Sequence, residues 1–244
     1  MPEGPSIVLL REATVDCVGK QVLRATGNAK IDIARLKGKR VVGIHSWGKH
    51  FLIEFDDFSI RIHFLLFGSY LIDDRKQTAP RLSLRFKGRE LNFYSCSVRY
   101  IEGPLAAVYD WRADIMSDQW DAKLARAKLH KIPKAFACDA LLDQTIFAGV
   151  GNIIKNEVLF RIRLHPLSTI GALSSRKLNE LIKQARQYSF DFLAWKRAFV
   201  LRKHWLAHTK SICPRCHIPF VKGKIGKTQR RSFYCERCQI KYMP

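Results

Sequence analysis

Two closely spaced cysteine pairs near the end of the chain constrain its folding more than any other feature. Cys213 and Cys216 form one C-x2-C pair, Cys235 and Cys238 form a second, and 18 residues separate the pairs. Two such pairs about 15–20 residues apart are typical of a zinc ribbon, in which four thiolates surround the metal. Because so short a segment buries little core, we expect one Zn²⁺ to supply its folding energy. Four sulfur ligands leave no position for a reactive water, so the predicted site is structural. The alternatives are four unrelated thiols, or His217 as a competing ligand.

The segment between the two pairs is strongly basic. It runs Lys222-Gly-Lys-Ile-Gly-Lys-Thr-Gln-Arg-Arg231, which predicts a hairpin whose tip is held out by the metal site. Lys and Arg side chains neutralise and bind nucleic-acid phosphates. We therefore expect the tip to contact phosphate groups; the alternative is a solvated loop without a ligand.

The whole chain carries a large excess of positive charge. Its 43 Lys and Arg against 21 Asp and Glu give a formal net charge of +22 over 244 residues. Because such an imbalance repels itself in the folded state, it favours a polyanionic partner: DNA, RNA or an anionic membrane surface. The alternative is a generally basic, soluble protein. A hydrophobic fraction of 47% excludes an intrinsically disordered chain.

Features of the chain also indicate a compartment. Its start, MPEGPSIVLL, lacks the basic segment and long apolar core of a secretory signal. No apolar run approaches the ~20 residues of a membrane span. We expect an intracellular protein, in the cytoplasm and nucleoid of a bacterium or the nucleus of a eukaryote. There Cys17, Cys96 and Cys138 are expected to be reduced thiols in or near the core.

Three regions of different texture predict an α+β fold. Residues 1–120 hold short β-branched or aromatic runs between turn residues, which indicates a β-sandwich or barrel preceded by a helix near residues 5–18. Residues 121–207 are helical, and residues 208–244 form the cysteine-rich finger. The predicted strands are Val41–His45, His50–Phe55, Ser59–Phe64, Arg81–Phe86 and Glu90–Tyr94; the predicted helices are Ala140–Phe147, Asn152–Phe160 and Ser174–Lys196, the last capped by Ser174 or Ser175.

The chain begins with an unusual combination, Met1-Pro2-Glu3-Gly4-Pro5, which does not suit the interior of a helix or strand. Once Met1 is removed, Pro2 presents a secondary amine. An α-amino group titrates near ~8, so a useful fraction is neutral at physiological pH. Such an amine attacks an electrophilic carbon, for example a sugar C1′, and forms an iminium that accepts electrons. The adjacent Glu3 is suited to proton exchange with the substrate. The alternative is an ordinary flexible terminus.

Three motifs occur in order along the chain: Pro2–Pro5, Asp143–Asn152 (Asp-Gln-Thr-Ile-Phe-Ala-Gly-Val-Gly-Asn) and the two-pair finger. Together they resemble the formamidopyrimidine-DNA glycosylase/endonuclease VIII family, and the resemblance spans the chain. It implies an N-terminal catalytic β-sandwich domain with flanking helices, a helix–two-turn–helix domain, and a terminal finger, which we assign to residues 1–120, 121–207 and 208–244. It further implies a bifunctional glycosylase/lyase that flips a damaged base out of double-stranded DNA. The chemistry needs no catalytic metal or redox cofactor. We expect a monomer, because one copy suffices to clamp one lesion.

The resemblance assigns catalytic roles to four residues. Pro2 matches the nucleophile that forms the Schiff base, and Glu3 matches the acid/base carboxylate. Lys49, in Ser46–Leu52, matches a lysine that contacts backbone phosphate and assists β-elimination. Arg230 matches the finger arginine that grips phosphates beside the lesion and serves the second elimination. Taken alone, Lys49 would pass for a surface lysine at the start of a strand.

The resemblance also assigns DNA contacts. Asn152 follows Gly149-Val150-Gly151 at a turn where backbone N–H groups and the Asn152 amide are suited to hold a phosphate. Arg231 is the ambiguous neighbour of the finger arginine. Glu157 matches a glutamate near the catalytic pocket, with a capping or structural role as the equal alternative.

Two features favour the endonuclease VIII branch, whose substrates are oxidised pyrimidines. The segment Leu91–Ser97 resembles that branch, and little room precedes Cys213 for the base-capping loop of the purine branch. Leu66 aligns with the residue that wedges into the base stack. Leu65 stands where that branch has a glutamine, so it offers no hydrogen bond to an orphaned base, and the opposite-base preference is expected to be relaxed or changed. The alternative is that Leu65 and Leu66 are core residues of a strand.

Two other classes of protein compete with an active enzyme. A non-catalytic zinc-ribbon protein that binds nucleic acid or damaged DNA needs only the charge and the finger, but leaves Pro2-Glu3 unexplained. A family member that has lost its lyase activity would be expected to lack some of Pro2, Glu3, Lys49 and Arg230, and all four are present. The sequence therefore favours the enzyme.

Overall fold

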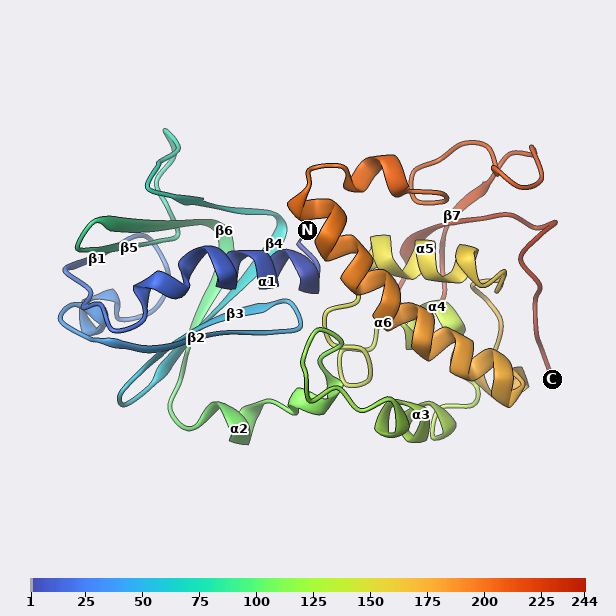
Figure 1. Ribbon diagram of the computed structural model, residues 1–244, viewed down its shortest axis with the longest axis horizontal. Coiled ribbons are helices and arrows are strands. Elements are labelled where there is room, and N and C mark those ends of the chain that lie inside the picture. The colour runs from blue at the N-terminus through green and yellow to red at the C-terminus, as the bar shows by residue number, and fades with distance from the viewer. Residues whose placement is uncertain (1) are drawn as a thin grey trace. The chain divides into compact units, whose positions relative to one another are not determined.

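The computed structural model describes residues 2–244. The chain divides into two compact units, Met1–Asp110 and Trp111–Pro244 (Figure 1). The expected division into residues 1–120, 121–207 and 208–244 stays a prediction.

The first unit is built on one six-stranded antiparallel sheet with the strand order β1-β5-β6-β4-β3-β2. All five predicted strands are confirmed as strands, and helix α1 (Gly4–Thr14) begins close to the predicted start. A 3₁₀ turn at Val15–Cys17 follows it. Helix α1 packs against β2 and β3 through buried side chains that include Ile7 and Leu10. The bounds are β1 Arg24–Thr26, β2 Val41–Trp47, β3 His50–Phe55, β4 Ser59–Ile72, β5 Leu82–Phe86, β6 Arg89–Ile101 and α2 Leu105–Val108.

Aromatic contacts show how this sheet folds over itself into a sandwich. Phe51 on β3 is in register with Ile62 on β4, which is in register with Val98 on β6. The ring of Phe51 nevertheless lies 5.8 Å, centroid to centroid, from the ring of Phe93 on β6, five residues from Val98. Phe64 also contacts Phe93 at 6.3 Å. The long strands β4 and β6 therefore serve both layers, and the aromatic core lies between them.

The second unit is mainly helical. It contains α3 (Ala122–His130), α4 (Ala137–Ala140), α5 (Asn152–Arg161) and α6 (Ser175–Arg197), with 3₁₀ turns at Trp111–Ala113, Ile170–Ala172 and Leu201–His204. The predicted N-cap of α6 is confirmed at Ser174, whose side chain accepts a hydrogen bond from the Lys177 N–H at 3.2 Å. Leu178, Leu181, Ile182 and Ala185 are all buried, as their 3–4 spacing predicts.

The predicted helix over Ala140–Phe147 is wrong. Helix α4 ends at Ala140, and turns occupy the following residues. The cause is local, since the Asp143 carboxylate accepts hydrogen bonds from the Thr145 N–H and hydroxyl at 2.8 and 2.7 Å. The Gln144 amide binds the Leu142 and Val150 carbonyls. Short polar side chains that bind nearby backbone compete with the helical pattern, which the apolar periodicity alone does not reveal.

The finger follows α6 in the chain. Strands β7 (Val221–Ile225) and β8 (Arg230–Tyr234) form the predicted hairpin. Its small core joins Phe220, Cys213 and Cys235 to Phe160 of α5. The rings of Phe160 and Phe220 lie 5.4 Å apart. No helix within residues 2–244 combines the length and apolar character needed to cross a membrane.

We predict that Phe93→Ala lowers the free energy of unfolding by about 3–5 kcal/mol, because a fully buried ring that joins both sheet layers would leave a cavity. Urea denaturation measures the change. Phe67→Ala is the matched control, since Phe67 is 83% exposed, and its expected effect lies within about 0.5 kcal/mol. Equal effects of the two substitutions would contradict this account of the core.

Candidate functional site

The beginning of the chain leads directly into α1. Glu3 has an extended backbone (φ −106°, ψ 170°) and occupies the N-cap position, and its carbonyl accepts a hydrogen bond from the Ser6 N–H at 2.8 Å. Its side chain is only 3% exposed, whereas Pro2 is half-buried. Pro5 is favourable in the first turn because its missing N–H would have no helical partner there. The expected removal of Met1 falls outside the described residues.

Lys49 lies in a two-residue turn between β2 and β3. Gly48 precedes it with φ 53°, a left-handed conformation that glycine adopts without a Cβ penalty. Trp47 and His50 flank the turn as a register pair. The Trp47 indole N–H donates to the Asp110 carbonyl at 3.0 Å, and the Tyr109 hydroxyl lies 3.2 Å from His50 Nδ1. The turn is thereby tied to the segment that follows the sheet.

Two histidine side chains, His50 and His63, lie near Lys49. Burial, and then the charges of Arg61, His63 and Lys49, lower the pKa of His50 to about 3. Burial, followed by the charges of Lys49 and Arg61, also lowers the pKa of His63. The two rings lie 5.1 Å apart. Both imidazoles are therefore neutral at physiological pH, and the positive charge is concentrated on Lys49 and Arg61, which suits an anionic ligand.

Three apolar side chains project from the middle of β4. Leu65, Leu66 and Phe67 are 51%, 57% and 83% exposed, so the alternative that Leu65 and Leu66 are core residues is wrong. They lie where the pairing of β4 with β6 shifts register, between Phe64 and Ser69. Gly68 makes this bulge possible, because a Cβ there would lie 2.8 Å from the Ser95 carbonyl oxygen.

Gly151 and Asn152 form the start of α5, as predicted. Gly151 is the N-cap and Asn152 the first helical residue. Gly149 has φ 100°, and its N–H donates to the Gln144 side chain at 3.1 Å, which braces the turn before the helix. The start of a helix carries the positive end of its dipole, which favours a nearby anion.

The Arg231 carbonyl joins the finger to α5. It accepts hydrogen bonds from Asn152 Nδ2 at 2.9 Å, Lys155 Nζ at 3.3 Å and Asn156 Nδ2 at 3.3 Å. Lys155 Nζ also donates to the Ser232 hydroxyl at 2.7 Å. Two predicted site residues, Asn152 and Arg231, therefore meet through a side chain and a peptide carbonyl. Arg230, the first residue of β8, is half-buried beside this contact.

A second contact, at Asp139 next to the end of α4, holds the tip of the finger hairpin. The Asp139 carboxylate accepts from the Lys227 N–H at 2.8 Å, the Thr228 N–H at 2.9 Å and the Thr228 hydroxyl at 2.8 Å. Gly226 comes so close that a Cβ would lie 2.6 Å from the carboxylate. Asp139, Lys155 and Asn156 were not among the residues predicted from the sequence. The only available indication was the polar run Lys155–Glu157 inside an otherwise apolar helix, because partners more than 70 residues away cannot be read from spacing.

Glu157 has the structural role that the sequence left open. Its side chain is fully buried, and it accepts from the N–H groups of Leu206, Ala207 and His208 at 2.8–3.0 Å. Arg161 lies 3.5 Å from the same carboxylate. Glu157 thus fixes the segment that enters the finger.

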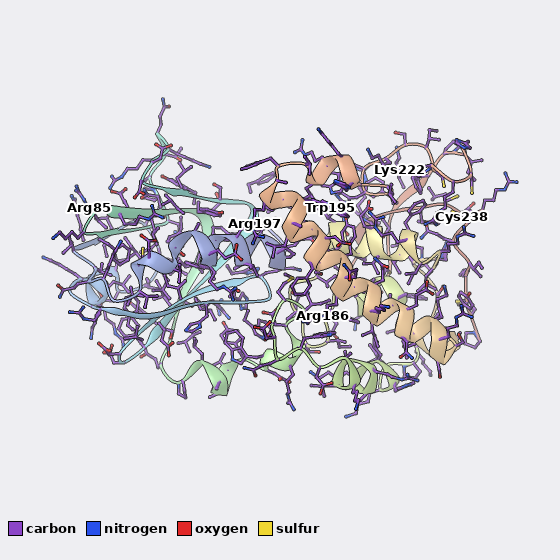
Figure 2. All side chains as sticks on the ribbon, viewed as in Figure 1. Arg85, Arg186, Trp195, Arg197, Lys222 and Cys238 are labelled. Carbon is purple, nitrogen blue, oxygen red and sulfur yellow. The ribbon has the colours of Figure 1, made fainter. Side chains whose placement is uncertain are left out.

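The four cysteines of the two pairs come together. Their sulfur atoms all lie within 4.8 Å of one another, and Cys213 Sγ and Cys238 Sγ are 3.8 Å apart. A tetrahedron with metal–sulfur bonds of ~2.3 Å has sulfur–sulfur edges of about 3.8 Å. This set of thiolates therefore fits a metal ion, and His217 is not among its members. Cys238 and Lys222 of this finger are labelled in Figure 2.

The predicted site residues divide between the two units. Pro2, Glu3, Lys49 and Leu66 belong to the first. The second contains Gly151, Asn152, Arg230, Arg231 and the four cysteines.

We predict that Glu157→Gln destabilises the second unit by about 2–3 kcal/mol, because an amide cannot replace a carboxylate that accepts from three backbone N–H groups. Thermal and urea unfolding measure the effect. Glu180→Gln is the matched control, since Glu180 pairs with Lys177 at the surface of α6 and should change stability by less than about 0.5 kcal/mol. A Glu157 variant as stable as the control would refute the structural role.

Comparisons with known proteins agree with this architecture. The model of the formamidopyrimidine-DNA glycosylase N-terminal domain matches residues 1–96, and that of the formamidopyrimidine-DNA glycosylase H2TH domain matches residues 113–188. Solved structures with the same fold include a viral DNA glycosylase (TM-score 0.85, 18% identity) and a complex of Lactococcus lactis Fpg with DNA containing an abasic site (TM-score 0.85, 22% identity). Each match covers 98% of this chain and 100% of the other.

Curated relatives are similar over most of this chain. Mouse endonuclease 8-like 3 is 31% identical over 206 residues, which cover 81% of this chain and 34% of the relative. Mouse endonuclease 8-like 2 is 33% identical over 196 residues, which cover 74% of this chain and 57% of the relative. The chain thus spans between a third and just over half of the length of these relatives. With both domain models matched in order along one fold, the predicted resemblance is confirmed: the chain belongs to the formamidopyrimidine-DNA glycosylase/endonuclease VIII family.

Proposed function

We propose that this protein is a bifunctional DNA glycosylase and AP lyase of base excision repair. The observation that carries the proposal is the pairing of Pro2 with a buried Glu3 at the start of α1, in a chain of this family. A zinc-finger protein that only binds nucleic acid needs neither a nucleophilic amine nor an acid/base carboxylate next to it. The net charge of +22 supports a DNA partner.

The chemistry begins at the Pro2 nitrogen. Its lone pair attacks C1′ of the damaged nucleotide, and the glycosidic electrons leave with the base. The Pro2 nitrogen then loses its proton and the C1′–O4′ bond breaks, which opens the sugar ring and forms the C1′=N iminium, while Glu3 supplies the proton that O4′ takes up. The resulting iminium acidifies the C2′ protons. Loss of one C2′ proton breaks the C3′–O bond and releases the 3′ phosphate by β-elimination. A second, δ-elimination releases the 5′ phosphate and leaves a one-nucleotide gap.

Cations hold the phosphates during these steps. Lys49 projects from a rigid turn beside neutral imidazoles, which supports a role in phosphate contact and β-elimination. Arg230 would grip a flanking phosphate in the second elimination. The clamp on the Arg231 carbonyl fixes the backbone next to Arg230 and keeps Asn152 and the Gly151 turn beside the finger. This arrangement supports a shared phosphate site.

The apolar bulge supports a role in base flipping. Leu66 is exposed on a bulge that Gly68 keeps tight, as a wedge into duplex DNA requires. Leu65 lacks the hydrogen bond of a glutamine, so the opposite-base preference should be relaxed or changed. We favour oxidised pyrimidines as substrates, double-stranded DNA as the partner and a monomer as the active form. A place in the nucleoid or the nucleus follows from the proposed substrate.

Zn²⁺ is the metal we assign to the four thiolates. Two C-x2-C pairs with tetrahedral spacing suit it, and four sulfur ligands complete its coordination. The ion would hold the finger folded and take no part in the reaction. The folded hairpin would then hold Arg230 and Arg231, at the start of β8, in place.

Borohydride trapping tests the proposed mechanism. We expect the protein, incubated with duplex DNA containing one abasic site, to form a covalent band after reduction of the iminium, and Pro2→Thr to abolish it. Pro5→Ala leaves the terminal amine in place and should keep the band. Absence of a band from protein whose mass shows loss of Met1 would exclude the proline mechanism and favour a damage-binding protein.

Metal removal tests the finger. We expect one zinc per chain by elemental analysis. Cys216→Ala should lower both zinc content and DNA affinity, because metal binding supplies the folding free energy of the finger. Cys96→Ala is the control, because the Cys96 thiol is buried in the first unit. The zinc content of this variant should be unchanged. Full DNA affinity in metal-free protein would contradict the assignment.

A further inference from the structure

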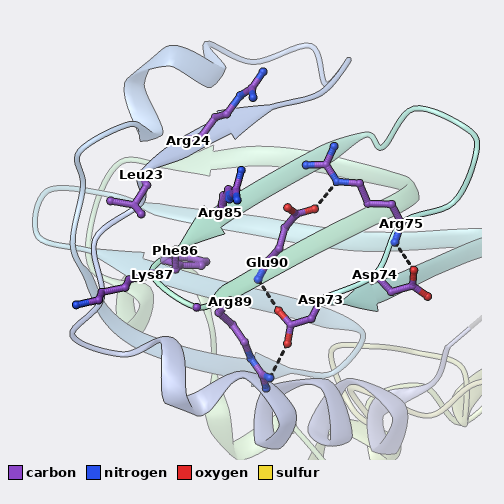
Figure 3. A pocket seen from close by; sticks show the side chains of 11 residues that line it. Leu23, Arg24, Asp73, Asp74, Arg75, Arg85, Phe86, Lys87, Arg89 and Glu90 are labelled. Carbon is purple, nitrogen blue, oxygen red and sulfur yellow. Dashed lines mark hydrogen bonds and ion pairs between the residues drawn. The ribbon is translucent and has the colours of Figure 1, made fainter.

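A basic hollow lies at the β1 edge of the six-stranded sheet. It measures about 820 Å³ and is formed by β1, β5, the turn after β5, the start of β6 and the segment after β4 (Figure 3). The charged side chains that line it are Arg24, Arg75, Arg85, Lys87 and Arg89 against Asp73, Asp74 and Glu90. None of these residues has a role in the reaction proposed above.

Two arginines face each other across the strands of this hollow. Arg24 on β1 is in register with Arg85 on β5, and both side chains are exposed. Within residues 2–244 neither guanidinium has a hydrogen bond or an ion pair, and the same holds for the Lys87 amine. Like charges directly opposite each other destabilise an antiparallel pair. The fold thus retains an unfavourable arrangement that a bound anion would convert into a favourable one.

The carboxylates of the hollow are already engaged. Asp73 accepts from Arg89 Nη1 at 2.8 Å and from the Glu90 N–H at 2.7 Å. Glu90 is in register with Arg85, but its carboxylate accepts from Arg75 Nε and from Asn92 Nδ2. Figure 3 shows the Glu90 side chain turned toward Arg75. Asp74 accepts from the backbone N–H of Arg75. The lining therefore holds five cations against three carboxylates, and Arg24, Arg85 and Lys87 are the cations that form no ion pair among the described residues.

We propose that this hollow binds phosphodiester groups of a nucleic-acid strand, outside the segment that carries the lesion. A guanidinium matches two phosphate oxygens with two parallel N–H donors, and two guanidiniums side by side offer four. The three cations without an ion pair extend from the edge strand across β5 to its turn. A row of three cations can contact successive phosphates along one strand. A single small anion would contact only one of the three cations.

Arginine side-chain resonances test the proposal in the intact protein. The Nε–Hε signals of Arg24 and Arg85, assigned with Arg24→Gln and Arg85→Gln, are followed while inorganic phosphate or an undamaged oligothymidylate of about eight nucleotides is added. We expect both signals to shift. The concentration of phosphate groups at the midpoint of the shift should be about tenfold lower for the oligonucleotide than for inorganic phosphate. No shift with either probe overturns the site. Equal midpoints overturn its assignment to a polynucleotide.

Salt dependence gives a second readout, because each phosphate contact on a single strand adds about 0.7 to the slope of log affinity against log salt. We expect the double variant Arg24→Gln/Arg85→Gln to reduce this slope by about 1.4 on a long undamaged single strand. Arg176→Gln, at an exposed residue of α6, is the matched control and should leave the slope unchanged. An unchanged slope in the double variant contradicts the proposal.

Thermal unfolding separates loss of the site from loss of the fold. Removal of the cross-strand repulsion should leave the Tm of the double variant at or above that of the parent in phosphate-free buffer. Phosphate should raise the Tm of the parent by more than that of the double variant, which keeps the phosphate site proposed beside the finger. Equal phosphate effects on both proteins count against the site. Trapping on abasic DNA should persist in the variant, so its failure would concern the mechanism and not this hollow.

Discussion

The buried polar run on α5 is the constraint on which the second unit depends. Lys155, Asn156 and Glu157 are three consecutive residues with at most 1% exposure, in a helix whose other buried residues are apolar. Burial of charge is unfavourable unless each group is hydrogen-bonded. Here Lys155 and Asn156 bind the Arg231 carbonyl, and Glu157 binds the segment that enters the finger. The finger is thus held by directional bonds from one helix, which fix its orientation more narrowly than apolar contact would.

This attachment determines where the cations of the finger can act. Asp139 fixes the hairpin turn, α5 fixes the β8 backbone at Arg231, and Phe160 packs on Phe220. The four thiolates close the base of the same small unit. A segment of this size has too little core to hold a shape alone. The bonds to α5 and Asp139 therefore hold the hairpin that carries Arg230, and a metal ion on the four thiolates would add to them.

In the first unit, backbone geometry plays the corresponding part. The turn at Gly48 and the tight bulge at Gly68 place Lys49 and Leu66 at defined points of the sheet. Half-buried neutral histidines beside Lys49 leave the local charge on the lysine and Arg61. Positive charge elsewhere in this unit is partly neutralised by carboxylates, as at Arg89 and Asp73. The opposed pair Arg24 and Arg85 is an exception to this pattern.

The sequence by itself determined five strands of the six-stranded sheet, the helices α1, α5 and α6, the finger hairpin and the thiolate set, because each depends on local periodicity or short spacing; it missed the short strand β1. It also determined the family, because the motifs can be read from the sequence without knowledge of tertiary contacts. It failed at Ala140–Phe147, where side-chain bonds to nearby backbone defeat an apolar pattern. Only the tertiary structure decided that Leu65 and Leu66 are exposed, that Glu157 binds a distant segment, and that Asp139 and Lys155 hold the finger. These facts depend on partners many residues away, and a hydrogen bond between distant residues leaves no periodic mark in the chain.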